Sequence, residues 1–396
     1  MSRFLKIAIV LLAIAAMVTP AMAEDMLSLG GQMRVRGWYL DNDQEANSGE
    51  ATRTWVDQRL RIGGKLSVAD GVSITFRTDI TESNWGSGNL YGSGRTGLQQ
   101  WDRAHIDLAF DSFSLRAGQQ FVWFLNSGAF NTQSNGLKIS TKGPVALTAF
   151  AFLQEDNGAS YSSGAKNAGD ADGFDYGVNL AFGADAFKAN ILVAAQNKVT
   201  NSDEDVYLIG ADATFNMDAF KLIAELDFFT GDSTSTVDAF GTQLFVDGSL
   251  AASEALTVGG QLYYALGDTD DDQYTYLGND FGAWDPLYAH GSGLDNEQLG
   301  SGRPFVFFGN DAGVIAGRIY ADAKVSDAFK IGGSISYLEP EEDAVTTADS
   351  AMTLALGMKY AVMAHTSLGA QLEYIDVDAP NTDASIGAGV GLFVNF

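Results

Sequence analysis

Histidine and cysteine offer little reactive chemistry in this chain of 396 residues, which contains three histidines and no cysteine. Without cysteine the chain has no thiolate nucleophile, disulfide or covalent attachment point for haem. It also lacks a Gly-x-Ser-x-Gly elbow and a phosphate-binding loop between a strand and a helix. His105 and Asp107 have the spacing that puts two side chains on one face of a strand, but we interpret His105 as a polar structural residue. The sequence therefore predicts no enzyme, no catalytic or metal-binding residue and no cofactor.

The basic residues of the first third are more distinctive, because many of them lie two positions apart. Residues two apart on a strand point to the same side, and this alternation places eight bases on one face: Arg34, Arg36, Arg59, Arg61, Lys65, Arg77, Arg103 and Arg116. Only three acids share that face, namely Asp57, Asp79 and Asp107. Guanidinium groups stay charged and suit carboxylates, so the pattern predicts a surface that favours anionic or carboxylate-bearing solutes. The alternative interpretation is that these side chains pair across neighbouring strands and only fill a polar interior.

Acidic residues dominate the chain as a whole, and the formal net charge is −27. Further along, the same face is mixed, with Lys188, Lys221, Glu225, Asp227, Arg318, Asp322, Lys324, Lys330, Lys359 and Glu373. Many other acids lie in polar segments such as DNDQEANSGE, at 41–50. Asp268, Asp270 and Asp272 have the opening spacing of a calcium loop without its glycine and final glutamate. We expect solvated loops, with divalent-ion binding at a lipopolysaccharide layer or repulsion of anions at the mouth of the pore as the alternatives.

The elements that would position these side chains are amphipathic strands. In DGVSITFRTDI, at 70–80, apolar and polar residues alternate in the way that is typical of a strand in a membrane barrel. Short turns are expected near 69, 111, 142, 184, 217, 252, 326 and 363, and longer polar loops near 41–54, 84–100, 125–134, 156–172, 198–204, 231–237, 268–311, 340–350 and 378–383. Eight turns and nine loops separate eighteen strands, with sixteen as the alternative count. The sequence thus predicts an all-β, antiparallel, up-and-down transmembrane barrel, in which loops 125–134 and 268–311 are placed to narrow or cover the pore.

The two ends of the chain fit this architecture. Residues 1–23 combine Arg3 and Lys6 with a short apolar run and Ala-Met-Ala, which predicts a secretory signal peptide cleaved after Ala23. Residues 24–396 would then form one barrel domain with a net charge of −27 − 2 = −29. The last segment alternates apolar and small residues up to Phe396, so we expect it to face lipid and to pair with the first strand, leaving no free edge. A soluble β-sandwich is the alternative architecture.

The terminal phenylalanine resembles the C-terminal signature of bacterial outer-membrane barrels. The segments GGQMRVRGWYLDN and TWVDQRLRIGGKLSVADGVSITFRTDI are similar to the opening hairpins of the alginate-export-type barrels and related porins of proteobacteria. This similarity covers about a fifth of the chain and rests on Arg34, Arg36, Asp57, Gln58, Arg59 and Arg61. The resemblance implies a Gram-negative outer-membrane channel, and it does not identify alginate as the substrate.

The pattern and the resemblance together predict a porin through which small hydrophilic solutes diffuse. Its expected partners are outer-membrane lipid, lipopolysaccharide and the solutes, with a homotrimer as one candidate assembly and no nucleic acid. The alternative function is a barrel sheath that holds a partner such as a multihaem cytochrome or an exported polymer. Such a cytochrome would bring its own haem, because this chain has no cysteine.

Overall fold

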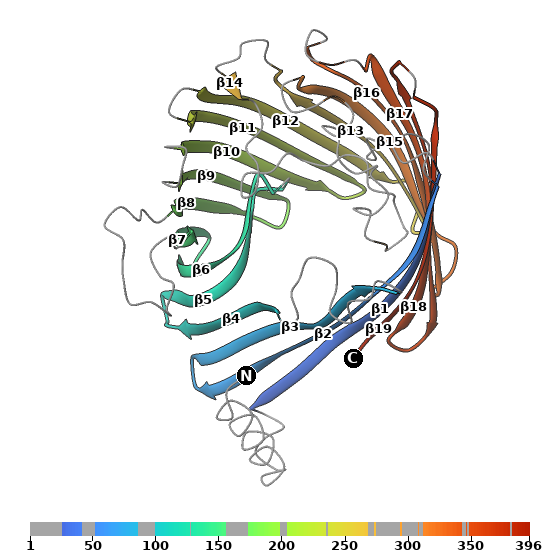
Figure 1. Ribbon diagram of the computed structural model, residues 1–396. Helices are drawn as coiled ribbons and strands as arrows, with labels where there is room; N and C mark the ends of the chain where they lie inside the picture. The colour runs from blue at the N-terminus through green and yellow to red at the C-terminus, as the bar shows by residue number, and fades with distance from the viewer. Residues whose placement is uncertain are drawn as a thin grey trace, which may run out of the picture.

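The chain forms a closed antiparallel β-barrel in a computed structural model (Figure 1). The structure describes residues 26–41, 52–85, 100–126, 128–155, 173–198, 204–234, 237–267, 273–274, 294, 308, 312–342, 346, 348–380 and 382–396. The signal peptide expected at 1–23 lies outside these residues and stays a prediction. Within the described ranges, no helix is long and apolar enough to cross a membrane.

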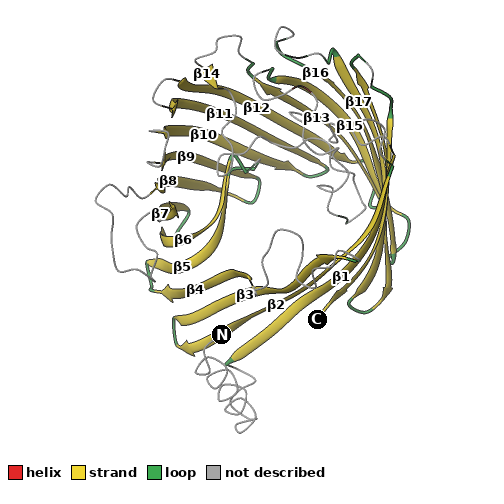
Figure 2. Cartoon of the chain, in the orientation of Figure 1, coloured by secondary structure: helices red, strands yellow, loops and turns green. Residues whose placement is uncertain are grey.

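Eighteen strands make the wall of the barrel, as the sequence predicts. They are β1 (Leu27–Asp41), β2 (Arg53–Ala69), β3 (Val72–Asn84), β4 (Gln100–Ala109), β5 (Phe113–Phe124), β6 (Phe130–Thr141), β7 (Val145–Glu155), β8 (Gly173–Ala184), β9 (Phe187–Lys198), β10 (Glu204–Met217), β11 (Phe220–Thr234), β12 (Val237–Ala251), β13 (Leu256–Ala265), β15 (Val314–Lys324), β16 (Phe329–Glu339), β17 (Ser350–Met363), β18 (Thr366–Asp378) and β19 (Ser385–Asn395). A two-residue strand, β14 (Gln273–Tyr274), pairs in parallel with β12 and adds nothing to the wall. Neighbouring wall strands are antiparallel throughout (Figure 2).

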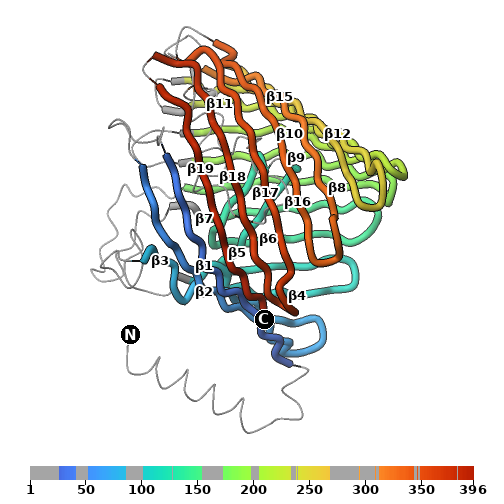
Figure 3. The backbone as a smooth tube through the Cα atoms, turned by 90° about the vertical axis from the view of Figure 1, so that its right-hand side faces the viewer, coloured from blue at the N-terminus to red at the C-terminus, as the bar shows by residue number. Residues whose placement is uncertain are grey.

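The last strand closes the ring by pairing with the first. Residues Gln32–Asp41 of β1 lie opposite Asn395–Ile386 of β19 (Figure 3). Ile386, Val390 and Leu392 are exposed on the outer side of β19, whereas the glycines between them face inward. The apolar face of the final strand therefore lies on the outside of the barrel up to the C-terminus, as expected. Because β19 pairs with β1, the barrel has no free edge.

Short turns connect the strands at one end of the barrel, at the positions predicted from the sequence. Two-residue turns require left-handed backbone, and Gly71 and Asp218 supply it with φ values of 72° and 48°. The longer connections lie at the other end. Two of them are shorter than predicted, because β6 begins at Phe130 within the expected loop 125–134 and β11 continues to Thr234 within the expected loop 231–237.

The inward face is less polar than the sequence pattern suggests. Two apolar clusters line it, one built on β5–β11 from Val122, Leu125, Ala129, Phe130, Phe150, Phe152, Leu192, Ala194, Val206, Leu208 and Phe229, and one on β12–β18 from Phe245, Tyr263, Ala265, Phe308, Ala312, Val314, Ala316, Leu338, Ala348, Ala351, Ile375 and Val377. Leu125 and Ala129 belong to the first cluster, and we call the described residues 125–126 and 128–129 the inner segment. In Figure 1 the teal ends of β5 and β6 rise inside the ring of strands.

Most of the expected loop 268–311 lies outside the described residues, but two of its side chains are placed. Leu294 is buried against Trp38 and Phe393, both on the inward face of β1 and β19. Its Cδ2 atom lies 2.8 Å from the position that a Cβ would take at Gly391. Phe308 is buried in the cluster on β12–β18. Both described side chains of this loop therefore contact the inner wall of the barrel.

Candidate functional site

The eight predicted bases lie on five consecutive strands and on one face. Arg34 and Arg36 come from β1, Arg59, Arg61 and Lys65 from β2, Arg77 from β3, Arg103 from β4 and Arg116 from β5. Lys138 on β6 is opposite Arg116 and extends the row by one strand. We call these nine side chains the basic wall. The sequence could have indicated Lys138, because the same alternation continues along residues 130–141, but the prediction stopped at the fifth strand.

Carboxylates accompany the basic wall on the same face and bridge its strands. Arg36 Nε donates to Asp57 Oδ1 at 2.9 Å, and Trp38 Nε1 donates to Asp57 Oδ2 at 2.6 Å. Arg61 binds Asp79 with two hydrogen bonds of 2.6 and 2.9 Å. These pairs join neighbouring strands. Several bases of the basic wall are therefore paired across strands, as the alternative interpretation of the sequence proposed.

Further pairs continue the row towards β5. Arg116 Nε lies 2.7 Å from Asp107 Oδ1, and His105 Nδ1 lies 3.2 Å from Asp107 Oδ2. His105 is 3% exposed and stands among charged wall residues, which fits the polar structural role expected for it. Arg34 Nη2 pairs with Glu82 Oε1 at 3.1 Å, and Arg77 pairs with Asp102.

Glu82 and Asp102 were missed by the sequence analysis because β-bulges shift the alternation. On β3, Leu60 faces Thr81 and Arg61 faces Asp79, so Ile80 is an extra residue and Glu82 turns to the inner face. On β4, Asp102 is itself the extra residue between Trp101 and Arg103. The expected ratio of eight bases to three acids is therefore wrong, and in the described part of the chain five acids face nine bases: Asp57, Asp79, Glu82, Asp102 and Asp107.

Arg59 differs from the paired arginines of the basic wall. It lies directly opposite Arg34, while Arg36 lies opposite Asp57 and Arg61 lies opposite Gln32, so only one of the two arginines on each strand is directly opposed by another arginine. Arg59 Nη2 donates to Gln32 Oε1 at 3.2 Å, and its buried Nε has no hydrogen-bond partner in the described residues. No carboxylate lies within salt-bridge distance of Arg59 among those residues.

The opposite wall carries buried acids. Asp212 on β10 faces Glu225 on β11, and Asp227 follows two residues later on the same inward face. These three side chains, which we call the acidic patch, are at most 5% exposed. The inner segment reaches them from β5, because a Cβ at Gly210 would collide with both Leu125 Cδ1 and Asp227 Oδ1. The barrel thus places a basic wall on β1–β6 and an acidic patch on β10–β11.

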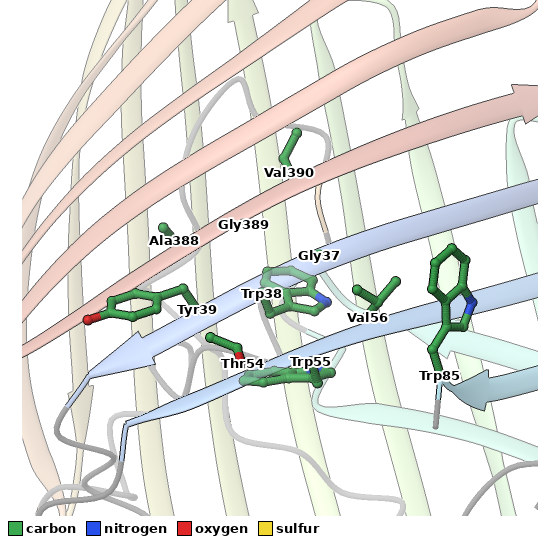
Figure 4. A pocket seen from close by; sticks show the side chains of 10 residues that line it. All are labelled: Gly37, Trp38, Tyr39, Thr54, Trp55, Val56, Trp85, Ala388, Gly389 and Val390. Carbon is green, nitrogen blue, oxygen red and sulfur yellow. The ribbon is translucent and has the colours of Figure 1, made fainter. Parts of the chain in front are cut away.

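A groove of about 610 Å³ lies where β19, β1 and β2 meet (Figure 4). Tyr39, Val56 and Val390 line it, and they occupy the outward positions of their strands. Gly37 and Ala388 leave the space between them. The groove therefore opens on the outer surface of the barrel, and its floor reaches the inward residues Trp38 and Gly389.

Comparison with known proteins supports a channel. A sequence-family profile described as Gram-negative porin matches residues 8–282. The crystal structure of Pseudomonas aeruginosa OccK9 (OpdG) is similar over 93% of this chain and 98% of that one, with a TM-score of 0.62 and 10% identity. The crystal structure of Acinetobacter baumannii OccAB4 is similar over 94% of this chain and 99% of that one, with a TM-score of 0.61 and 11% identity. The crystal structure of the outer membrane channel DcaP of Acinetobacter baumannii is similar over 93% of this chain and 97% of that one, with a TM-score of 0.51 and 11% identity.

At these identities the solved structures establish the fold alone. No curated protein matches the sequence. The comparisons give no support to the narrower resemblance to alginate-export-type barrels, and they do not favour a sheath. The profile covers more than half of the chain, and the closed eighteen-strand barrel agrees with it. The chain therefore belongs to the Gram-negative porin family, and it is an outer-membrane channel for the diffusion of small solutes.

Proposed function

We propose that this porin prefers small anionic solutes, in particular carboxylates, and that they pass along the basic wall. The observation that carries the proposal is the imbalance of nine bases over five acids on β1–β6, with Arg59 lacking a carboxylate partner in the described residues. Rings and rows of basic side chains are a common means of selecting anions in pores. A carboxylate solute that passes Arg59 supplies the charged partner that no described carboxylate of the protein provides within salt-bridge distance.

The acidic loops oppose this preference only at a distance. Exposed charges are screened over about 8 Å at physiological ionic strength. Inside a narrow pore the effective dielectric constant is lower than in bulk water, so fixed charges on the wall act more strongly. The wall therefore dominates wherever the solute is held close to it.

Liposome swelling tests the proposal with a small carboxylate and an uncharged sugar of similar size. Arg59→Gln removes the unpaired charge and should slow carboxylate entry by roughly fivefold, corresponding to about 1 kcal/mol of attraction between charges at 4 Å in water. Sugar entry should stay unchanged. Equal effects on both solutes, or no effect on either, would reject Arg59 as a binding residue.

A further inference from the structure

The acidic patch and the inner segment form a contact across the barrel. Asp212, Glu225 and Asp227 are 5%, 2% and 2% exposed. Gly210 on β10 leaves a space that Leu125 Cδ1 and Asp227 Oδ1 share, so an apolar side chain of the inner segment lies directly over a carboxyl oxygen. That oxygen is buried and has no hydrogen-bond partner in the described residues, and the same is true of Asp212 Oδ2.

Glu225 and Asp227 are hydrogen-bonded to each other through their side chains. Ionised carboxylates are acceptors only, so a hydrogen bond between two carboxyl groups requires that one of them carries a proton. With that proton in place, the pair holds one negative charge at most. This state is compatible with the apolar cover that Leu125 provides.

Asp212 anchors the inner segment. Its carboxylate accepts a hydrogen bond from the backbone N–H of Asn126 and one of 2.7 Å from Asn190 Nδ2. Leu125 itself has a left-handed backbone with a φ of 65°, a conformation that is costly for a residue with a side chain. The docked position of the inner segment therefore stores strain and depends on the contacts at β10 and β11.

Few other charged groups face the pair. On β12 the residues opposite Asp227 and Glu225 are the uncharged Gln243 and Phe245, and the next inward acid, Asp247, lies opposite Ile223 and accepts from Gln261 and Tyr320. On the inward positions of β9 and β11, Lys188 and Lys221 lie further towards the short turns. Leu125 and Asn126 of the inner segment carry no charge. The titration of this patch is thus governed by Asp212, Glu225 and Asp227 themselves.

We propose that the Glu225–Asp227 pair is a proton-operated latch for the inner segment. When the shared proton is bound, Leu125 packs on β10, Asn126 is held by Asp212, and the segment narrows the lumen. When the proton leaves to water in the lumen, the carboxylates of Glu225 and Asp227 are both charged, so they repel each other and attract water. Leu125 then loses its packing against β10. The strained backbone at Leu125 favours release. The channel is consequently narrower at low pH than at high pH.

Single-channel conductance of the purified barrel in planar bilayers tests the latch. In equal salt on both sides, wild-type conductance should rise by roughly twofold or more as the pH is raised from about 5 to about 9. The variant Glu225→Gln/Asp227→Asn keeps neutral, hydrogen-bonding side chains and should stay in the low-conductance state over the whole range. Asp247→Asn is the matched control, because Asp247 is an inward acid that already accepts from Tyr320 and Gln261 at 2.8 and 2.7 Å. This control should retain the wild-type profile.

A cross-link supplies a second, independent test. The chain has no cysteine, so Leu125→Cys/Gly210→Cys introduces a single pair. The oxidised variant should lose the rise in conductance at high pH, and a reducing agent should restore it. A flat wild-type profile, a neutral variant that still responds to pH, or a locked channel that still opens would each overturn the latch. The readout is conductance in symmetric salt, so these outcomes are separate from the failure of the proposed anion preference.

Discussion

At the residue scale, the basic wall is held together by pairs that the sequence only partly indicates. Alternation was enough to place Arg34, Arg36 and Asp57 on one face, because the period of a strand is two. It failed at Ile80 and Asp102, where one extra residue moves the following side chains to the other face. A single sequence gives no signal for such bulges, so the acids that they add could not be predicted.

Among the carboxylates that pair with the basic wall, we expect loss of Asp57 to lower the free energy of unfolding most. It accepts hydrogen bonds from Arg36 and Trp38, and Arg36 is 2% exposed. Asp57→Ala leaves that guanidinium buried without this partner, so the free energy of unfolding should fall by roughly 3–5 kcal/mol. Urea unfolding of the barrel in lipid vesicles measures the difference.

The control for this prediction is Asp327→Ala, which removes a carboxylate from an exposed turn where it contacts Lys324 at 2.6 Å. Exposed pairs contribute little, so this variant should unfold like the wild type. Equal stability of Asp57→Ala and Asp327→Ala would contradict the structural role of the Arg36–Asp57–Trp38 cluster.

At the element scale, the strand register separates a lipid face from an inner face. The eighteen strands and their turns could be predicted because alternation and turn residues are local signals. The apolar clusters of the interior could not be predicted: alternation places Phe229 on the inward face with Asp227, but it does not show that Phe229 packs with side chains of other strands such as Phe130 and Phe152. The inner segment was expected to narrow the pore, and its contact with β10 depends on packing across the barrel.

Ile319 tests the register on the side away from the basic wall. It is 65% exposed in the middle of β15, next to Arg318, which is buried on the inner face. Ile319→Arg should cost about 2–4 kcal/mol if the site lies at the bilayer midplane, as measured by reversible folding into vesicles. Ile319→Leu conserves volume and should fold like the wild type. An arginine at 319 that is tolerated as well as leucine would show that the faces are reversed.

At the scale of the whole molecule, the loop between β13 and β15 bears on the size of the pore. Leu294 packs on Trp38 and Phe308 in the cluster on β12–β18, so both described side chains lie against the inner wall. Deletion of 270–305 removes the Leu294 anchor and should raise single-channel conductance. Deletion of 159–169 in the loop between β7 and β8 is the control of comparable type. Unchanged conductance after the first deletion would place that loop outside the path of the ions.

The central claim concerns selectivity, and the reversal potential in a salt gradient tests it most directly. Arg59→Gln/Lys138→Gln removes two charges of the basic wall without breaking any of the carboxylate pairs described above. The matched control is Lys330→Gln/Lys359→Gln, which removes two lysines that face each other on β16 and β17. The account predicts an anion-selective wild type, a clear shift towards cations in the first variant and a smaller shift in the second. A cation-selective wild type whose reversal potential does not respond to Arg59→Gln/Lys138→Gln would contradict it.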